Sequence, residues 1–81
     1  MQSGWKPMSV HIGKAIKKKM KERGLTVVGL SRELGCHRTN IYRIFDSPTV
    51  DTGVLHRLSS ILHYDFFKIY SKDLESRIDE K

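Results

Sequence analysis

Apolar residues recur every three or four positions along most of this chain, which is the period of an α-helix with one buried face. The first such run contains Ile12, Ile16 and Met20. Lysines fill many of the positions between them, and Gly24 follows with the freedom to end a helix in the left-handed conformation. The pattern predicts a first helix over residues 11–23. Gly13 inside it either weakens the helix slightly or lets another helix approach closely.

A second, local signal marks the starts of four further helices. Two apolar residues five positions apart flank a residue that can cap a helix, as in a hydrophobic staple. The four sets are Leu25 and Leu30 around Thr26, Cys36 and Ile41 around His37, Val50 and Leu55 around Asp51, and Tyr64 and Ile69 around Asp65. They predict helices near residues 27–34, 38–45, 52–62 and 66–70, with turns at Gly35 and His63. No strand pattern occurs, so the predicted fold class is all-α.

The third predicted helix, residues 38–45, has clearly separated apolar and polar faces. Its apolar stripe consists of Ile41, Ile44 and Phe45, and its opposite face carries Arg38, Thr39, Tyr42 and Arg43. Guanidinium groups, a phenol and a hydroxyl on an exposed helix provide the chemistry needed to contact base edges in a DNA groove.

The run GLTVVGLSRELGCHRTNIYRIF, residues 24–45, resembles the helix-turn-helix of the bacterial and phage Xre family, whose fold is that of the lambda-repressor DNA-binding domain. The resemblance is carried by Leu30, Ser31, Gly35, Cys36, Ile41 and Ile44, and it covers about residues 11–70. It implies a compact five-helix bundle that binds double-stranded DNA as a small transcriptional regulator. Domains of this type usually bind as homodimers on two half-sites about 34–36 Å apart.

The resemblance also implies which residues contact DNA, because the recognition helix of such a motif lies in the major groove. The expected DNA-binding residues are Arg38, Thr39, Tyr42, Arg43, Asn40, His37 and Lys17. Either arginine can bind guanine O6 and N7, and Asn40 can pair with adenine or point sideways. His37 is expected to cap the helix, less well than Ser or Asp, and to reach a phosphate. The alternative for each residue is a solvated surface side chain.

Two departures from the family pattern concern phosphate contacts. Val27 stands where the family often has a glutamine that holds a phosphate. Asp46, Ser47 and Pro48 stand where an Asn-Gly-type turn usually approaches the DNA backbone, and Asp46 would repel it. We therefore expect affinity to depend more on the arginines and on the lysines of the first helix.

Composition and charge favour a polyanionic partner. The 81 residues carry a net charge of +6 with neutral histidines, and the sequence pI is about 9.7. Residues 72–81 sum to −1 and the other 71 residues to +7. The lysines of the first helix, Lys17 among them, contact phosphates or form a solvated face.

The residues needed for other functions are missing from the sequence. Cys36 is the only cysteine, which excludes an internal disulfide, and an inert core thiol suits a reducing cytoplasm. A DNA-binding protein there is expected to associate with the nucleoid. The four histidines are scattered, so we expect no metal, no cofactor and no enzymatic activity. The sequence also predicts no membrane span, no signal peptide and no small-molecule ligand.

The predicted domain organisation has three parts. Residues 1–10 form a flexible arm, in which Trp5 and Lys6 either contact DNA or belong to a disordered leader. Residues 11–71 form the helix-turn-helix domain, and residues 72–81 a charged tail that is either a frayed helix or a small dimer contact. Two alternative functions remain open: a protein–protein interaction module with the same fold, and non-specific nucleic-acid binding.

Overall fold

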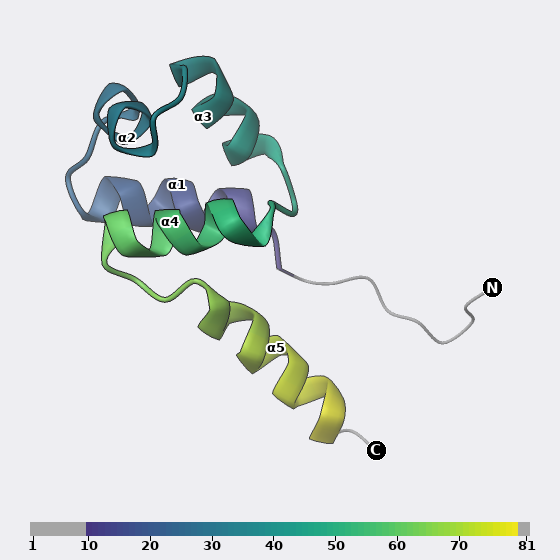
Figure 1. The fold of residues 1–81 in the computed structure, drawn as a ribbon. Coiled ribbons are helices and arrows are strands. Elements are labelled where there is room, and N and C mark those ends of the chain that lie inside the picture. The colour runs from purple at the N-terminus through teal and green to yellow at the C-terminus, as the bar shows by residue number, and fades with distance from the viewer. Residues whose placement is uncertain (1–9, 80–81) are drawn as a thin grey trace.

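Five α-helices make up the secondary structure of residues 10–79, the part of the chain described by the computed structural model (Figure 1). They are α1 (Ile12–Glu22), α2 (Val27–Leu34), α3 (Arg38–Asp46), α4 (Thr52–Leu62) and α5 (Phe67–Asp79). The first four agree with the predicted ranges to within one residue at each end. The all-α prediction is confirmed, and residues 10–79 contain no strand.

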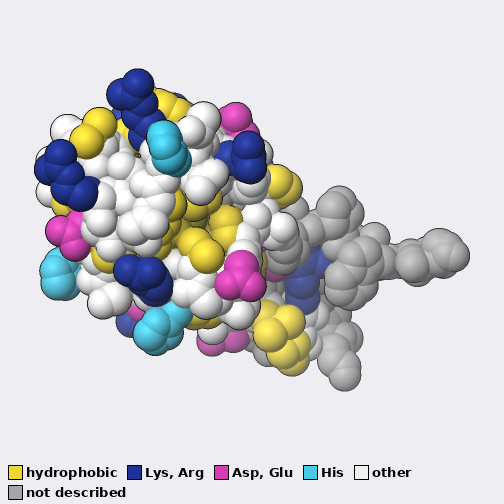
Figure 2. All heavy atoms as spheres, turned by 45° about the horizontal axis from the view of Figure 1, so that its top comes forward, with side chains coloured by type: hydrophobic (Ala, Val, Ile, Leu, Met, Phe, Trp, Pro, Cys, Tyr) yellow, Lys and Arg dark blue, Asp and Glu magenta, His cyan; other side chains and the backbone are white. Residues whose placement is uncertain are grey.

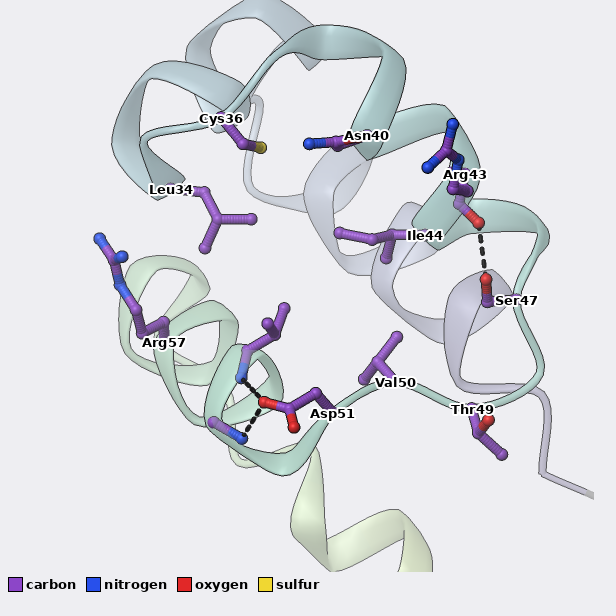
Figure 3. Close-up of a pocket in the computed structure, with 12 residues that line it drawn as sticks. Leu34, Cys36, Asn40, Arg43, Ile44, Ser47, Thr49, Val50, Asp51 and Arg57 are labelled. Carbon is purple, nitrogen blue, oxygen red and sulfur yellow. Dashed lines mark hydrogen bonds between the residues drawn. The ribbon is translucent and has the colours of Figure 1, made fainter.

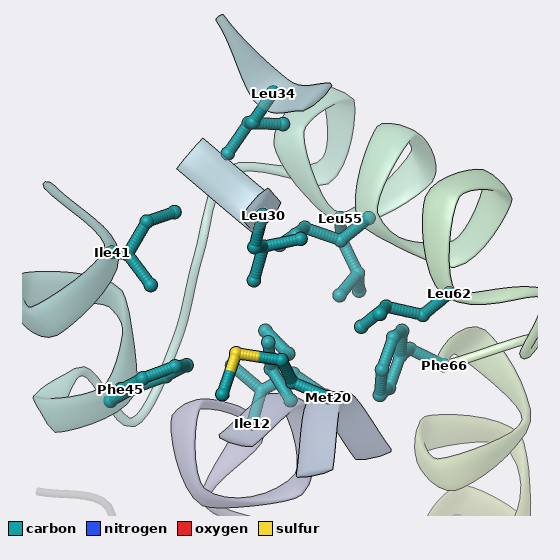
Figure 4. Packing of buried hydrophobic residues seen from close by; sticks show 11 residues of the cluster. Ile12, Met20, Leu30, Leu34, Ile41, Phe45, Leu55, Leu62 and Phe66 are labelled. Atoms are coloured by element: carbon teal, nitrogen blue, oxygen red, sulfur yellow. The ribbon is translucent and has the colours of Figure 1, made fainter. Parts of the chain in front are cut away.

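The core lies between α1, α2, α3 and α4. α2 and α3 lie on one side of the α1–α4 pair, and α5 leaves on the other side (Figure 1). The apolar face predicted for each helix points into this core (Figure 4). Its buried residues are Ile12, Ile16, Met20, Leu30, Leu34, Ile41, Phe45, Leu55, Leu58, Leu62 and Phe66. Full burial of one such side chain stabilises the fold by about 1.5–3 kcal/mol, so these residues supply most of the driving force.

The N-terminus of α1 is joined directly to the C-terminal end of α3. The Ile12 amide donates to the Pro48 carbonyl at 3.2 Å, and the Gly13 amide donates to the Ser47 carbonyl at 3.0 Å. Gly13 is buried, and a Cβ atom there would overlap the carbonyl oxygens of Ile44, Phe45 and Ser47. The close approach is therefore the correct explanation for this glycine. The cap of α1 was not predicted: His11 caps the helix, because its Nδ1 accepts from the Lys14 amide at 3.2 Å.

Three turns use left-handed backbone. Gly24 and Gly35 have φ values of 77° and 78°, and His63 has a φ value of 52°, at the ends of α1, α2 and α4 as predicted. The end of α4 also receives Arg23, whose Nε donates to the Leu62 carbonyl at 2.8 Å and whose Nη2 donates to the His63 carbonyl at 2.9 Å. Because cations are favoured at helix C-termini, Arg23 stabilises the position of α4 against α1.

Helix α5 is longer than the predicted segment 66–70. Phe66 is fully buried and Tyr70 is half-buried, and this burial raises the pKa of the Tyr70 phenol. The helix continues to Asp79, so most of the predicted charged tail is helical. Leu74 and Ile78 are more than half exposed on it. Of the predicted arm, only Val10 belongs to the described residues, and it packs against the core; Trp5 and Lys6 lie outside them.

No helix within residues 10–79 combines the length and the apolar character that crossing a membrane requires.

Candidate nucleic-acid interface

The turn between α2 and α3 fixes the direction in which α3 leaves α2. The Ser31 carbonyl accepts from the Gly35 amide at 2.8 Å and from the Cys36 amide at 3.0 Å, which closes α2 around left-handed Gly35. Ser31 itself is buried, and its Oγ donates to the Val28 carbonyl at 2.8 Å. Cys36 is half-buried and packs against the core. This agrees with the apolar residue that the predicted motif has at this position.

Core packing then determines which face of α3 meets solvent. Ile41 and Phe45 are buried and Ile44 is half-buried, so the helix cannot rotate without exposing them. The opposite face, Arg38, Thr39, Tyr42 and Arg43, is exposed, and so are the N-cap residue His37 and Asn40, which lies beside Ile44 at the edge of that face. Figure 2 brings this side of the molecule forward and shows separated basic side chains and a histidine around an apolar hollow. The structure thus brings six of the seven predicted residues onto one surface.

Neither guanidinium of this surface is engaged within the protein. Among residues 10–79, the Arg38 and Arg43 side chains make no hydrogen bond or ion pair. By contrast, Arg23 and Arg57 donate to backbone carbonyls, Arg57 to that of Glu33 at 3.2 Å. Arg38 and Arg43 therefore keep all their donors available for an external acceptor.

Lys17, the seventh predicted residue, is brought to α3 from α1. Its Nζ lies 5.8 Å from the centroid of the Phe45 ring. Tyr42 contacts the same ring edge-on, with centroids 6.4 Å apart and planes at 82°. The other side of α1 differs, because Lys19 lies over the Tyr64 ring and pairs with Glu22 at 2.8 Å. Among the described lysines of α1, Lys17 therefore lies against α3, whereas Lys19 lies against Tyr64.

A groove that sequence reasoning missed lies beside α3. Its volume is about 660 Å³, and it runs between α3, the loop after it and the start of α4 (Figure 3). Leu34, Ile44 and Val50 point toward one another across it. Asn40 and Arg43 also line it, so part of the predicted site borders an apolar surface. No local pattern could have revealed this groove, since its walls come from three separate segments.

One N-cap near this surface differs from its prediction. His37 occupies the N-cap position of α3, but its side chain makes no capping hydrogen bond, so the predicted capping role is wrong. Its exposed imidazole is instead turned to solvent. Val27 stands at the start of α2, where the family often has a glutamine. Its apolar side chain packs partly against the core. Asp46, the last residue of α3, is exposed.

The remaining titratable residues form no cluster suited to a metal ion within residues 10–79. No group of three or more His, Cys, Asp or Glu residues there is placed to hold a metal ion. His11 caps a helix and His63 forms a turn, so these two have structural explanations.

Comparison with protein families decides the assignment. The family model for the Cro/C1-type HTH DNA-binding domain matches residues 15–66, which include α2, the turn and α3. The chain belongs to the Cro/C1-type helix-turn-helix DNA-binding domain family. The predicted resemblance is thereby confirmed, and residues 15–66 form a DNA-binding domain of the Cro/C1 type. Comparisons with curated proteins and with solved structures gave no match.

Proposed function

We propose that this Cro/C1-type domain binds double-stranded DNA sequence-specifically, with the exposed face of α3 in the major groove. The observation that supports this is the pair of unengaged guanidiniums on a helix whose other face is buried. A helix fits the width of the major groove, and a bidentate arginine distinguishes guanine from the other bases. Arg38 stands in the first turn and Arg43 in the second, so each can reach a different base pair.

The other candidate residues contribute further contacts to DNA. Thr39 and Tyr42 contact a thymine methyl group, a base edge or a phosphate, and Asn40 contacts adenine or the backbone. Lys17 and His37 flank α3 and contact phosphates without reading sequence. The protein acts in the cytoplasm, associated with the nucleoid, as a homodimer that occupies two half-sites. Bound at an operator, it competes with or recruits polymerase.

A randomised pool of duplexes tests this function directly. The wild-type chain at one stated salt concentration should enrich a defined sequence, arranged as an inverted repeat if two copies bind together. Arg38→Ala should lose roughly 1–3 kcal/mol on that sequence and should relax the preference at one position. Arg32→Ala removes the same charge from an exposed position of α2 and should retain the preference. An identical pool for wild type and Arg38→Ala would refute sequence-specific binding through α3.

A second candidate function is supported by the groove beside α3. Its apolar walls and the half-exposed Tyr42 ring (53%) are features of protein interfaces, which favour aromatic and apolar residues over charged ones. In that case the domain would bind another protein through the same surface. The pool experiment separates the candidates, because a protein-binding surface would enrich no duplex. Equal binding of all duplexes would instead indicate a non-specific nucleic-acid binder.

A further inference from the structure

The groove beside α3 combines uncovered apolar side chains with polar groups that have no partner within residues 10–79. Ile44, Val50 and Val54 line it and are only half-buried, although each packs against the core. Its volume of about 660 Å³ lies within the range of roughly 300–1,000 Å³ found for clefts that bind small molecules. Such clefts have mostly apolar walls and a few polar groups that orient the ligand. The groove has both features.

The polar groups stand on one edge of the groove. Asn40 and Arg43 are three residues apart, so they project from the same side of α3, and both are exposed (Figure 3). Within residues 10–79, neither side chain makes a hydrogen bond or an ion pair. The amide and the guanidinium together offer several N–H donors, and those of the guanidinium form a fork that matches a carboxylate. This edge therefore favours an anionic group.

The charges around the rest of the groove give an anionic ligand a direction. The Asp51 carboxylate caps α4 at the opposite edge, and it repels a second carboxylate. Arg57 also lines the groove, but its Nη2 already donates to a backbone carbonyl of α2 at 3.2 Å. An anionic head group is therefore favoured beside Arg43, which leaves the rest of the ligand on the apolar residues.

We propose that the groove binds an amphipathic carboxylate, a small molecule with an aliphatic tail and one carboxylate group. The carboxylate accepts hydrogen bonds from Asn40 and Arg43. The tail packs on Ile44, Val50 and Val54, where its burial contributes in proportion to the apolar area removed from water. The sequence alone predicts no small-molecule ligand, because the walls of the groove come together only when three separate segments pack.

A small molecule fits this groove better than a protein segment does. A specific protein interface buries about 800 Å² on each partner, and charged residues are depleted from its core. Here three charged side chains border the groove: Arg43, Asp51 and Arg57. They confine the apolar surface to a few side chains, which is enough for an aliphatic tail and too little for the core of a protein interface.

The bound carboxylate would weaken DNA binding. Asn40 and Arg43 are among the residues that contact DNA in the proposed function, and an acceptor held on them leaves neither free for a base or a phosphate. The carboxylate also adds a negative charge next to the DNA backbone. DNA and the ligand then weaken each other by the same factor. This step rests on the proposed function, whereas binding in the groove does not.

Nuclear magnetic resonance of the isotope-labelled full chain, without DNA, tests the site with octanoate as the probe. Octanoate should shift the amide signals around the groove, those of Arg43 and Val54 among them, with a dissociation constant on the order of 0.1–1 mM. Octanol lacks the charge and should bind at least about fivefold more weakly. Butyrate has a shorter tail and should bind at least about tenfold more weakly. Shifts scattered over the whole surface, or equal binding of octanol and octanoate, would overturn the proposal.

Two pairs of variants test the assigned residues. Arg43→Gln should weaken octanoate binding about tenfold, whereas Arg32→Gln removes the same charge from α2 outside the groove and should change it by less than about twofold. Val54→Glu places a carboxylate on the apolar wall, in a first helical turn that accepts acidic residues, and should abolish binding. Val28→Glu makes the same change at an exposed valine of α2 and should retain binding. The spectrum of each variant shows that it is folded. Undiminished binding by Arg43→Gln or by Val54→Glu would overturn the assigned site.

Duplexes recovered from the randomised pool separate this inference from the proposed function. Saturating octanoate should weaken wild-type binding to the enriched duplex at least about fivefold in fluorescence anisotropy, and should not affect DNA binding by Val54→Glu. Octanoate that occupies the groove without this loss would overturn the competition with DNA. A pool with no enriched duplex would contradict the proposed function, while the shifts measured without DNA would still support the groove as a carboxylate site.

Discussion

His37 and Asp51 both precede a helix, but only Asp51 binds the amides that its helix leaves free. The Asp51 carboxylate accepts from the Gly53 amide at 3.0 Å and from the Val54 amide at 3.2 Å. His37 makes no such bond, although its carbonyl accepts from the Asn40 amide at 2.9 Å. The first turn of α3 therefore keeps unsatisfied amides at the end that we expect to face DNA. An anion there is favoured by the positive end of the helix dipole.

The two N-caps predict that replacing Asp51 costs more stability than replacing His37. Asp51→Ala should lower the free energy of unfolding by about 1 kcal/mol, because two amides of α4 lose their acceptor. His37→Ala should change the free energy of unfolding by only a few tenths of a kcal/mol, since no capping bond is lost. Urea unfolding of both variants, followed by circular dichroism, measures the difference. A His37→Ala variant as unstable as Asp51→Ala would contradict the uncapped start of α3.

The N-cap residues show which contacts a local sequence pattern can predict. Thr26, Asp51 and Asp65 were predicted as caps from their neighbours, and each accepts a backbone amide of its own helix. A cap acts over two or three residues, so a local pattern contains enough information to find it. Arg23 was not predicted, because its acceptors lie about 40 residues further along the chain. Contacts of this kind depend on how helices pack, and no spacing in the sequence records it.

At the scale of elements, the orientation of α3 depends on its close contact with α1. The Gly13 amide donates to the Ser47 carbonyl at 3.0 Å, and the absence of a side chain at Gly13 lets the end of α3 lie against α1. On the same side of α1, Lys17 lies over Phe45 of α3. The α1–α3 contact therefore sets both the tilt of α3 and the place of a lysine beside it.

Gly13→Ala should destabilise the protein although alanine favours helices. The added methyl group would overlap three backbone carbonyl oxygens, which cannot move as a side chain could, so we expect a loss of about 1–3 kcal/mol. Gly29→Ala is the matched control, because its Cβ would come no closer than 3.2 Å to Thr26 Oγ1. That substitution should change the free energy of unfolding by less than about 1 kcal/mol. Equal stability of the two variants in thermal unfolding would rule out the tight α1–α3 contact.

Elements also differ in how well the sequence predicts them. Helices α1 to α4 have strong apolar periodicity and clear ends, so their ranges were predicted to within one residue. The end of α5 was missed, because residues 71–79 contain no terminating glycine or proline and their charges mask a weak apolar pattern. The groove beside α3 was missed for another reason, since its walls come together only when α2, α3 and α4 pack. The exposed face of α3 was predicted correctly because its apolar stripe alone fixes it.

At the scale of the whole molecule, positive charge is concentrated away from the end of α5. Residues 72–81 sum to −1, whereas the other 71 residues carry +7. Such an imbalance orients the protein toward a polyanion before any specific contact forms. It also makes affinity depend on salt, because each phosphate that a cation neutralises releases counterions. The end of α5 is therefore the part of the molecule that is least attracted to DNA.

The salt dependence of DNA binding therefore measures which lysines reach phosphates. The logarithm of the association constant should fall linearly with the logarithm of salt concentration, by about 0.9 per phosphate contact on duplex DNA. Lys17→Ala should reduce this slope by roughly 0.9 and weaken all sequences alike, because Lys17 lies beside α3 and, in the proposed function, contacts a phosphate and not a base. Lys72→Ala removes an equal charge from exposed α5 and should leave the slope unchanged. Titrations of one labelled duplex between roughly 50 and 200 mM salt distinguish the two variants. If Lys17→Ala and Lys72→Ala give the wild-type slope, Lys17 is a solvated surface residue and the phosphate contacts must come from α3 itself.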